Sequence, residues 1–261
     1  MGDTSGRPDG GGLAVPAGSR ADDVLAQGIA DLGIACGRAQ TEKLLAYMEQ
    51  VLELNRHLNL TSITDRAQFI IKHILDSLAC CNWPEIKEAE RVVDIGTGAG
   101  FPGVPLAILM PQKSFILVDS LGKRLNAING FIEYINIDNV FTKHGRAESL
   151  AHQADFRERF DVCLSRAVSE LPVLAEYCLP FIKPGGWLYA YKGEAASQEM
   201  PKAEYAINLL GGQLAGIRDS GLKKYGIEHK IVIVEKTGPT PARYPRQAGK
   251  PEKAPLGTVK K

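Results

Sequence analysis

Glycines follow the first strongly apolar run of this chain. The run is RVVDIG (residues 91–96), and TGAGFPG (97–103) comes directly after it. Glycine at a turn between a strand and a helix admits positive φ and lets the backbone approach a ligand closely. The next apolar run ends at Asp119, where a carboxylate can accept hydrogen bonds from both hydroxyls of a ribose. These residues predict a nucleoside-binding site.

Two cofactor classes fit this loop. Gly98, Gly100 and Gly103 have the GxGxxG spacing of NAD-dependent dehydrogenases. Asp94 stands just before the first of these glycines, where a carboxylate suits a cationic aminoacid group and opposes a pyrophosphate. We therefore favour S-adenosyl-L-methionine over NAD. A glycine turn without a ligand leaves Asp94 and Asp119 unexplained together.

The segment FDVCLSRAV (160–168) follows at the place where methyltransferases hold their acceptor. It has no Asn/Asp-Pro-Pro-aromatic loop for an exocyclic amine and no Pro-Cys nucleophile, and Cys163 is interpreted as a core residue inside a strand. A ring nitrogen such as N7 of guanine needs only alignment with the methyl carbon and the sulfonium sulfur. The segment is consistent with such an acceptor and leaves others open.

Helical periodicity covers residues 22–81. One predicted helix places its apolar residues at spacings of three and four: Leu44, Leu45, Met48, Val51, Leu52 and Leu58. A second is predicted near Thr64-Asp65, where Asp65 and Gln68 have the spacing of a capping box. Its apolar residues are Phe69, Ile70, Ile74, Leu75 and Leu78.

Short apolar runs alternate with helical segments after Arg91. Strands are predicted at RVVDIG, SFILVDS, NVFTKH, FDVCLS and WLYAYKG, with helices over 103–110, 121–136, 147–154 and 169–183. This alternation predicts a parallel sheet, and residues 211–222 and 228–238 then predict a terminal antiparallel hairpin. The expected fold class is α/β: a Rossmann-like class I methyltransferase with a mostly parallel seven-stranded sheet, helices on both faces and an N-terminal helical extension.

The expected organisation has four parts: a disordered leader (1–20), a helical cap (21–85), an S-adenosylmethionine-binding domain (86–238) and a basic flexible tail (239–261). Composition is that of a globular protein, with 44% hydrophobic and 23% charged residues. The five cysteines show no C-x-x-C spacing, no histidine group resembles a metal site, and no apolar stretch could span a membrane. We expect a cytoplasmic monomer without a metal.

Charge is unevenly distributed. The net charge is +1, and residues 242–261 hold six Lys/Arg against one acid, which makes them +5 and the remainder −4. Such asymmetry indicates a polyanionic partner.

Several short motifs occur together in this chain. They are HLNLTS (57–62), HILDSL (73–78), Asp94 to Gly103 followed by PLAI (105–108), DSLGKR (119–124), GRAE (145–148), SRA (165–167) and YKG (191–193). Their order resembles that of the bacterial 16S rRNA (guanine-N(7))-methyltransferases, the glucose-inhibited division protein B family, from about Thr41 to Lys236. The resemblance implies methyl transfer from S-adenosyl-L-methionine to N7 of a guanine in 16S rRNA, as naked RNA or as the small ribosomal subunit.

The resemblance also implies site residues. The cofactor-binding set is Asp94, Gly96, Gly98, Gly100, Phe101, Asp119, Ser120, Ala147, Glu148 and Arg166. Within it, Asp119 and Ser120 take the ribose and Ala147 and Glu148 border the adenine. Arg166 is the predicted catalytic residue, in a positioning role at the face between cofactor and acceptor. The alternative for Arg166 is a surface or helix-cap arginine.

RNA contacts are predicted for cations and one amide: Asn59, Lys123, Arg124, Lys192, Arg243, Arg246 and Lys250. Lys123 and Arg124 open a helix, where the dipole disfavours cations, so either RNA phosphate or solvent holds them. His73 and Asp76 are candidates for the acceptor pocket, with core or capping roles as the alternative. Two other functions stay open: a small-molecule methyltransferase with the N-terminal helices as a lid, and a non-catalytic RNA-binding module.

Overall fold

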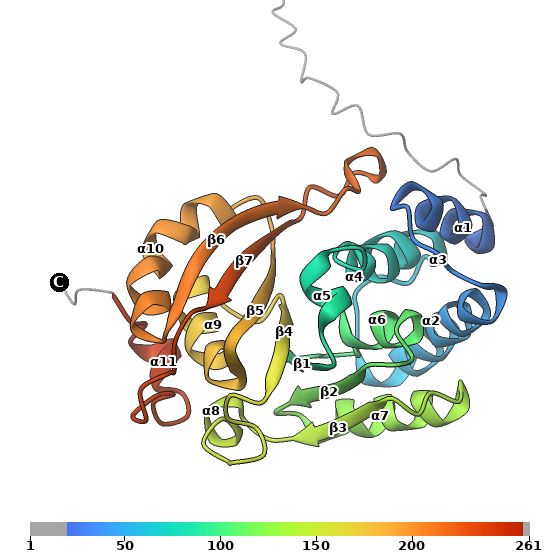
Figure 1. Ribbon diagram of the computed structural model, residues 1–261. Helices are drawn as coiled ribbons and strands as arrows, with labels where there is room; N and C mark the ends of the chain where they lie inside the picture. The colour runs from blue at the N-terminus through green and yellow to red at the C-terminus, as the bar shows by residue number, and fades with distance from the viewer. Residues whose placement is uncertain (1–19, 258–261) are drawn as a thin grey trace, which may run out of the picture.

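The computed structural model describes residues 20–257 (Figure 1). Most of the predicted leader and the last four residues, including Lys260 and Lys261, lie outside this range. The N-terminal helices are α1 (Ala21–Asp31), α2 (Arg38–Leu58), α3 (Arg66–Phe69), a π-helical segment (Ile70–Leu75), α4 (Asp76–Leu78) and α5 (Pro84–Glu88). Asp65 Oδ1 caps α3 by accepting the Gln68 N–H at 2.9 Å. The two helical patterns are therefore confirmed, although the second helix widens to π geometry.

A seven-stranded sheet forms the centre of the molecule, in the order β3-β2-β1-β4-β5-β7-β6. Its strands are β1 (Arg91–Ile95), β2 (Ser114–Asp119), β3 (Val140–His144), β4 (Phe160–Arg166), β5 (Ile182–Lys192), β6 (Gly212–Asp219) and β7 (Lys230–Lys236). The first five strands pair in parallel, and β7 runs antiparallel between β5 and β6. The predicted fold class is confirmed, including the terminal hairpin.

Helices cover both faces of this sheet (Figure 1). Those that follow β1 are α6 (Gly103–Leu109), α7 (Gly122–Tyr134), α8 (Ala147–Leu150), α9 (Leu171–Cys178), α10 (Ala196–Leu209) and α11 (Lys250–Lys253), with short 3₁₀ turns at Leu179–Phe181 and Lys223–Tyr225. The helix predicted over 169–183 ends earlier, because Pro180 cannot continue it and β5 begins at Ile182. Helix α10 was not predicted.

Two hydrophobic cores result from the alternation of side chains along the strands. Val92 of β1 faces the core shared with α1, α2, α6 and α7, whereas its neighbour Val93 faces the core shared with α9 and α10. Val92 and Val93 are both fully buried. Within residues 20–257, no helix has the length and apolarity needed to cross a membrane.

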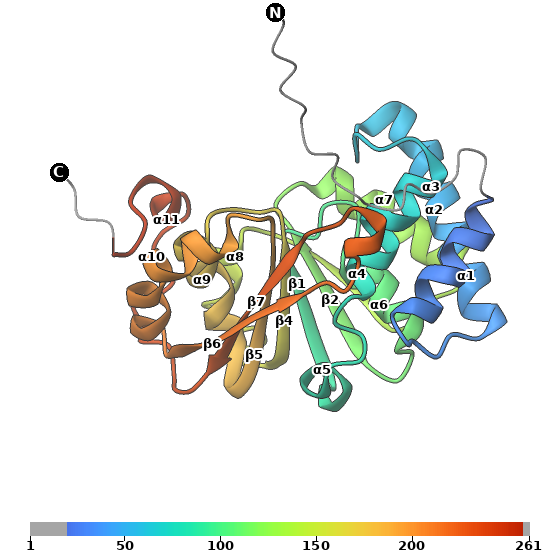
Figure 2. The ribbon, with the colours of Figure 1, turned by 90° about the horizontal axis from the view of Figure 1, so that it is seen from above.

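The connection between β6 and β7 reaches back to the N-terminal helices (Figure 2). Asp31, at the end of α1, accepts a hydrogen bond from the Tyr225 hydroxyl and pairs with Lys224. The hairpin connection therefore lies against the helices that precede the sheet, although 194 residues separate Asp31 from Tyr225 in sequence.

The C-terminal arm, which we define as Thr240–Lys253, is fixed to the body of the protein. Arg246 pairs at 2.6 Å with the fully buried Glu176 of α9. Arg157 donates to the carbonyl oxygens of Thr240 and Tyr244 at 2.8 and 2.9 Å, and a His152 ring nitrogen lies 2.8 Å from the Pro245 carbonyl oxygen. The arm therefore has fixed partners in this structure, in contrast to the flexible tail predicted from residue 239. Its basic composition is typical of solvated ends, but its partners lie far away in the sequence.

Candidate active site

Asp94 at the end of β1 organises the glycine loop. Its Oδ2 accepts the Thr97 hydroxyl at 2.8 Å and the Gly103 N–H at 2.9 Å. Its Oδ1 is buried and has no hydrogen-bond partner among residues 20–257. Burial raises the pKa of Asp94 to about 6, although those two hydrogen bonds and Arg166 act in the opposite direction. A cation brought near this carboxyl group would favour its ionised form.

Gly96 and Gly100 combine a positive φ with a lack of room for a side chain. A Cβ on Gly96, whose φ is +73°, would lie 2.5 Å from Val168 Cγ2. A Cβ on Gly100, whose φ is +90°, would lie within 2.2 Å of the Tyr47 hydroxyl. The first glycine therefore lets the loop lie directly under the segment after β4, and the second lets it lie against α2.

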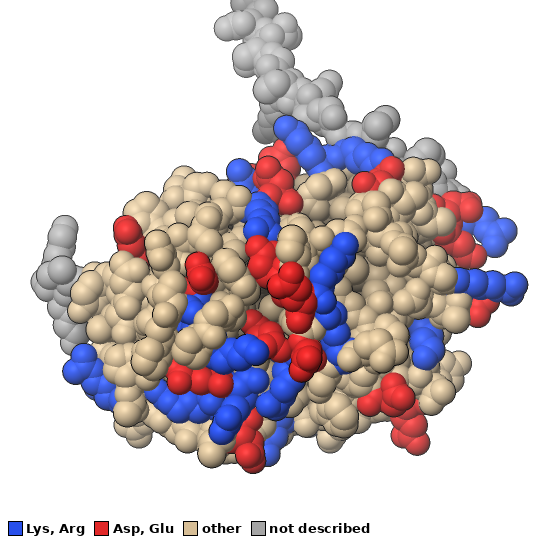
Figure 3. All heavy atoms as spheres, in the orientation of Figure 1, with Lys and Arg blue, Asp and Glu red and all other residues tan. Residues whose placement is uncertain are grey.

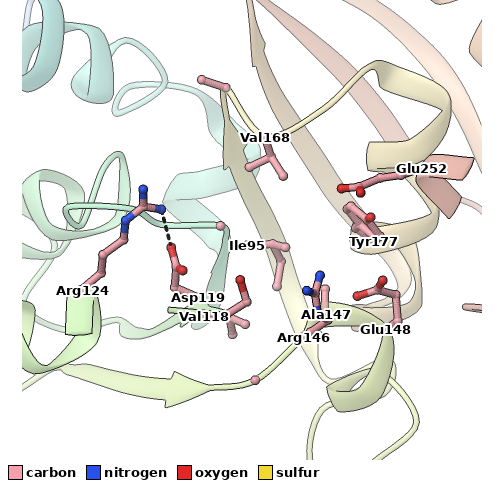
Figure 4. Close-up of a pocket in the computed structure, with 14 residues that line it drawn as sticks. Ile95, Val118, Asp119, Arg124, Arg146, Ala147, Glu148, Val168, Tyr177 and Glu252 are labelled. Carbon is pink, nitrogen blue, oxygen red and sulfur yellow. Dashed lines mark ion pairs between the residues drawn. The ribbon is translucent and has the colours of Figure 1, made fainter. Parts of the chain in front are cut away.

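A cavity of about 250 Å³ opens at the carboxyl ends of β1, β2, β3 and β4 (Figure 4). Its lining residues are Ile95, Gly96, Val118, Asp119, Ser120, Arg124, Gly145, Arg146, Ala147, Glu148, Ala167, Val168, Tyr177 and Glu252. We call it the strand-end cavity. Open α/β sheets bind ligands at this edge. Apolar side chains flanked by carboxylates fit the base and the ribose hydroxyls of an adenosine.

Asp119 holds two loops of this cavity together. Its Oδ1 accepts the Leu121 N–H at 2.8 Å and its Oδ2 accepts the Gly98 N–H at 3.0 Å. Arg124 lies 3.6 Å from the same carboxylate, as the dashed line in Figure 4 marks. Arg124, predicted to bind RNA, therefore lies on the wall of the strand-end cavity, where Asp119 offsets the unfavourable helix dipole.

Half of the predicted cofactor set lines this cavity: Gly96, Asp119, Ser120, Ala147 and Glu148. The others do not line it: Asp94, Gly98, Gly100, Phe101 and Arg166. Tyr177 and Glu252 were missed, because helix α9 and the C-terminal arm bring them to the cavity from segments without a binding motif.

A second cavity, of about 730 Å³, lies beside the first. It is lined by Ile63, Lys72, His73, Asp76, Arg166, Ala167, Gly193, Glu194, Gly226, Ile227, Glu228 and His229. Ala167 lines both cavities, and its φ of +54° is unusual for a residue with a side chain. We call this second space the acceptor cavity.

Asp76 is the centre of a polar network in the acceptor cavity. This fully buried carboxylate pairs with Arg166 at 3.0 Å and with His229 Nδ1 at 3.0 Å. The hydrogen bond to Asp76 raises the pKa of His229 above its usual value. Arg166 of β4 also contacts His73 of the π-helical segment. Short π-helical segments are frequent at functional sites.

His73 continues the network as a neutral ring. Burial and the Arg166 charge lower its pKa to about 4. Arg166 Nη2 lies 3.3 Å from His73 Nδ1, so Nδ1 accepts and Nε2 donates to the Thr61 hydroxyl at 2.7 Å. Phe101 stacks on His73 at 4.8 Å, and the Arg166 guanidinium lies 5.2 Å from the Phe101 ring centroid. Phe101 is therefore a buried support for this network and is not a wall of the strand-end cavity.

Apart from Arg124, which lines the strand-end cavity, the predicted RNA contacts divide into two groups. Lys192 is partly buried, with its ammonium 2.7 Å from Glu199 and 2.6 Å from the Ser169 carbonyl oxygen, and Arg246 is held by Glu176. Each of these cations already has internal partners, which argues against the RNA contacts predicted for Lys192 and Arg246. The remaining residues are exposed and stay predictions: Asn59, Lys123, Arg243 and Lys250. Figure 3 shows positive and negative side chains interspersed over the middle of one face.

Comparison with known proteins gives a consistent result. The chain matches the family described as GidB, rRNA small subunit methyltransferase G, over residues 40–225. It is 42% identical to the ribosomal RNA small subunit methyltransferase G of Alkaliphilus oremlandii, over 90% of this chain and 98% of that protein. It is 41% identical to the protein of the same name from Lachnoclostridium phytofermentans, over 91% and 98%. Among solved structures, an O-methyltransferase from Bacillus cereus in complex with SAH has a similar fold, with a TM-score of 0.52, 18% identity, and coverage of 83% of this chain and all of that one.

Proposed function

Since this chain belongs to the GidB family of rRNA small subunit methyltransferases G, we propose that its two adjoining cavities hold the two substrates of that reaction. The strand-end cavity holds S-adenosyl-L-methionine by its adenosine, and the acceptor cavity receives the guanine. The reaction is transfer of a methyl group from S-adenosyl-L-methionine to N7 of a guanine in 16S rRNA. The observation that carries the placement is Ala167, which lines both cavities.

Asp119 and Ser120 hold the ribose in this proposal, and Ala147 and Glu148 border the adenine. When bound, the cofactor supplies a methyl group on a positively charged sulfur. The cavity is lined by the carboxylates of Asp119, Glu148 and Glu252 and by the cations of Arg124 and Arg146. The Asp94 oxygen, which has no hydrogen-bond partner among residues 20–257, is the group that a cationic part of the cofactor would satisfy. The family match removes the NAD alternative, in agreement with the antiparallel β7, which an all-parallel dinucleotide fold lacks.

Positioning dominates the chemistry proposed for the acceptor cavity. N7 of guanine carries its own lone pair, so no base has to remove a proton before the methyl group is transferred. Arg166, held by Asp76 and His73, presents a fixed donor plane to the acceptor, and alignment of this kind can supply several kcal/mol of the barrier reduction, up to about 7–11. Methylation leaves the guanine ring positive, and the carboxylates of Glu194 and Glu228 on the cavity wall complement that charge.

Transfer of labelled methyl to small-subunit rRNA that lacks the modification tests the proposal. Borohydride–aniline cleavage then maps the product, because it reports methylation at N7 of guanine. We expect one strong cleavage with the natural protein and a loss of at least tenfold in kcat with Arg166→Lys, because lysine cannot reproduce the planar contacts of arginine.

Two results would overturn parts of this proposal. Labelled RNA without cleavage would move the acceptor atom away from N7. No labelling of RNA or of small subunits, together with measurable cofactor binding, would favour the small-molecule alternative.

A further inference from the structure

The C-terminal arm reaches into the strand-end cavity. Glu252 of α11 lines that cavity together with Tyr177 and Glu148, although the three residues belong to α11, α9 and α8. Figure 4 shows Glu148 and Glu252 on the same side of the cavity, with Tyr177 between them. The arm therefore completes a wall of the proposed cofactor site.

Three contacts hold the segment of the arm that carries Glu252. The Gly249 N–H donates to Glu148 Oε1 at 2.9 Å, so the arm is joined to the helix that borders the proposed adenine site. Arg246, six residues before Glu252, pairs with the buried Glu176 of α9, and Pro251, next to Glu252, is buried. The backbone that carries Glu252 is therefore held in place, while the Glu252 side chain is exposed at the cavity.

Tyr177 sets the chemistry of this wall. Burial, and then the charges of Glu148 and Glu252, raise the pKa of Tyr177 far above its usual value. Its hydroxyl therefore keeps its proton and can hold the Glu252 carboxylate in place. The Glu252 carboxylate therefore offers a ligand only hydrogen-bond acceptors, because an ionised carboxylate has no proton to donate.

We propose that Glu252 of the C-terminal arm reads the base of the cofactor by accepting a hydrogen bond from the 6-amino group of adenine, with Tyr177 as its positioning residue. The inference rests on the proposed placement of the adenosine in the strand-end cavity. Adenine presents a donor at position 6, whereas hypoxanthine presents an oxygen there, which a carboxylate repels. The Glu252 carboxylate thus favours adenine and disfavours hypoxanthine, and specific sites combine attraction and repulsion in this way.

Binding of S-adenosylhomocysteine and S-inosylhomocysteine, measured by calorimetry on the full chain, tests this inference. The two ligands differ only in the base. We expect the natural protein to prefer the adenine ligand, and Glu252→Ala to weaken its binding about tenfold, in line with a hydrogen bond to a charged group. Glu252→Ala should leave binding of the inosine ligand unchanged or stronger, so the preference falls. Lys253→Ala, on the same helix and outside the cavity lining, is the matched control and should behave like the natural protein.

Further variants separate reading of the base from a general loss of structure. Glu252→Gln keeps one acceptor oxygen and should retain part of the preference, and Tyr177→Phe should lower the preference less than Glu252→Ala does. An unchanged preference in Glu252→Ala, or equal losses for both ligands, would overturn the inference. Methylation of rRNA by Glu252→Ala at saturating cofactor should keep its kcat while the KM for the cofactor rises. Failure of the natural protein to methylate rRNA would instead count against the proposed function.

Discussion

Asp76 shows how single residues define the acceptor cavity. This carboxylate is fully buried and shared by Arg166 and His229, which come from β4 and from the loop before β7. Removing one partner from a buried ion pair leaves a charge that the interior cannot solvate, which typically destabilises a protein by about 3–5 kcal/mol. The network therefore fixes Arg166 at the same time as it joins three parts of the chain.

The pH dependence of stability should reveal this network. The pKa of His229 is raised in the folded protein relative to its usual value near 6.5. Its contribution to stability is therefore fully present below pH 6.5 and is lost as the pH rises through the folded pKa. We expect urea unfolding to show that His229→Gln loses more stability, relative to the natural protein, at pH 6 than at pH 8.5.

His57→Gln, on the exposed end of α2, is the control for this measurement and should show no such trend. His73 acts in the opposite direction, because its folded pKa is about 4 and its contribution is lost as the pH falls from 6.5 towards that value. His73 is unchanged in both variants, so the difference isolates His229. A deficit of His229→Gln that is equal at both pH values would contradict the Asp76–His229 pair.

A second prediction concerns Asp119, which is almost fully buried and accepts two backbone N–H groups. Asp119→Ala should weaken cofactor binding by about 2–4 kcal/mol if both ribose hydroxyls are held. It should also lower stability, since the N–H groups of Gly98 and Leu121 lose their acceptor. Calorimetry measures the first effect and thermal unfolding the second. A dissociation constant equal to that of the natural protein would remove the ribose role of Asp119.

Strands, helices and the C-terminal arm all contribute residues to the two cavities, and the sequence predicted some of these elements better than others. Short apolar runs between helical segments predicted the strands and the hairpin, and the glycine loop predicted the position of the cofactor site. The fixed position of the C-terminal arm was not predicted. Nothing in a basic, proline-containing segment indicates that Arg246 pairs with Glu176 on α9. Helix α10 was not predicted, and it contains Pro201, a residue that normally interrupts a helix.

The anchor of the arm can be tested directly. Arg246→Ala removes the partner of a fully buried carboxylate and should lower the free energy of unfolding by about 3–5 kcal/mol. Arg243→Ala removes an exposed cation of the same arm and should change it by less than about 0.5 kcal/mol. Denaturant titration compares them, and equal effects would mean that the arm is not anchored through Arg246.

At the scale of the whole molecule, charge is nearly balanced, with a net charge of +1. Binding to a polyanion therefore has to depend on local groups of cations more than on an overall field. We propose that the protein acts as a monomer, as expected from its sequence. Light scattering in solution measures this state, and activity that appears only with a dimer would contradict it.

Salt dependence identifies the cations that bind RNA phosphates. A variant that neutralises one phosphate fewer than the natural protein should have a slope of log affinity against log salt that is shallower by about 0.7–0.9. We expect this reduction for Lys123→Ala, an exposed lysine at the start of α7. Lys202→Ala, on α10 over the other face of the sheet, should keep the natural slope. Identical slopes for both variants would place Lys123 outside the RNA-binding surface.

The backbone conformation of Ala167 implies a trade-off between the stability of the protein and its catalytic activity. Its left-handed backbone, with φ at +54°, costs a residue with a side chain about 1–2 kcal/mol, whereas glycine would avoid that strain at an entropic cost of about 0.5–1 kcal/mol. Glycine at position 167 would also loosen the junction between the two cavities and the segment that carries Arg166. Selection for heat resistance alone would therefore favour glycine here, and the hardier protein would be the poorer catalyst.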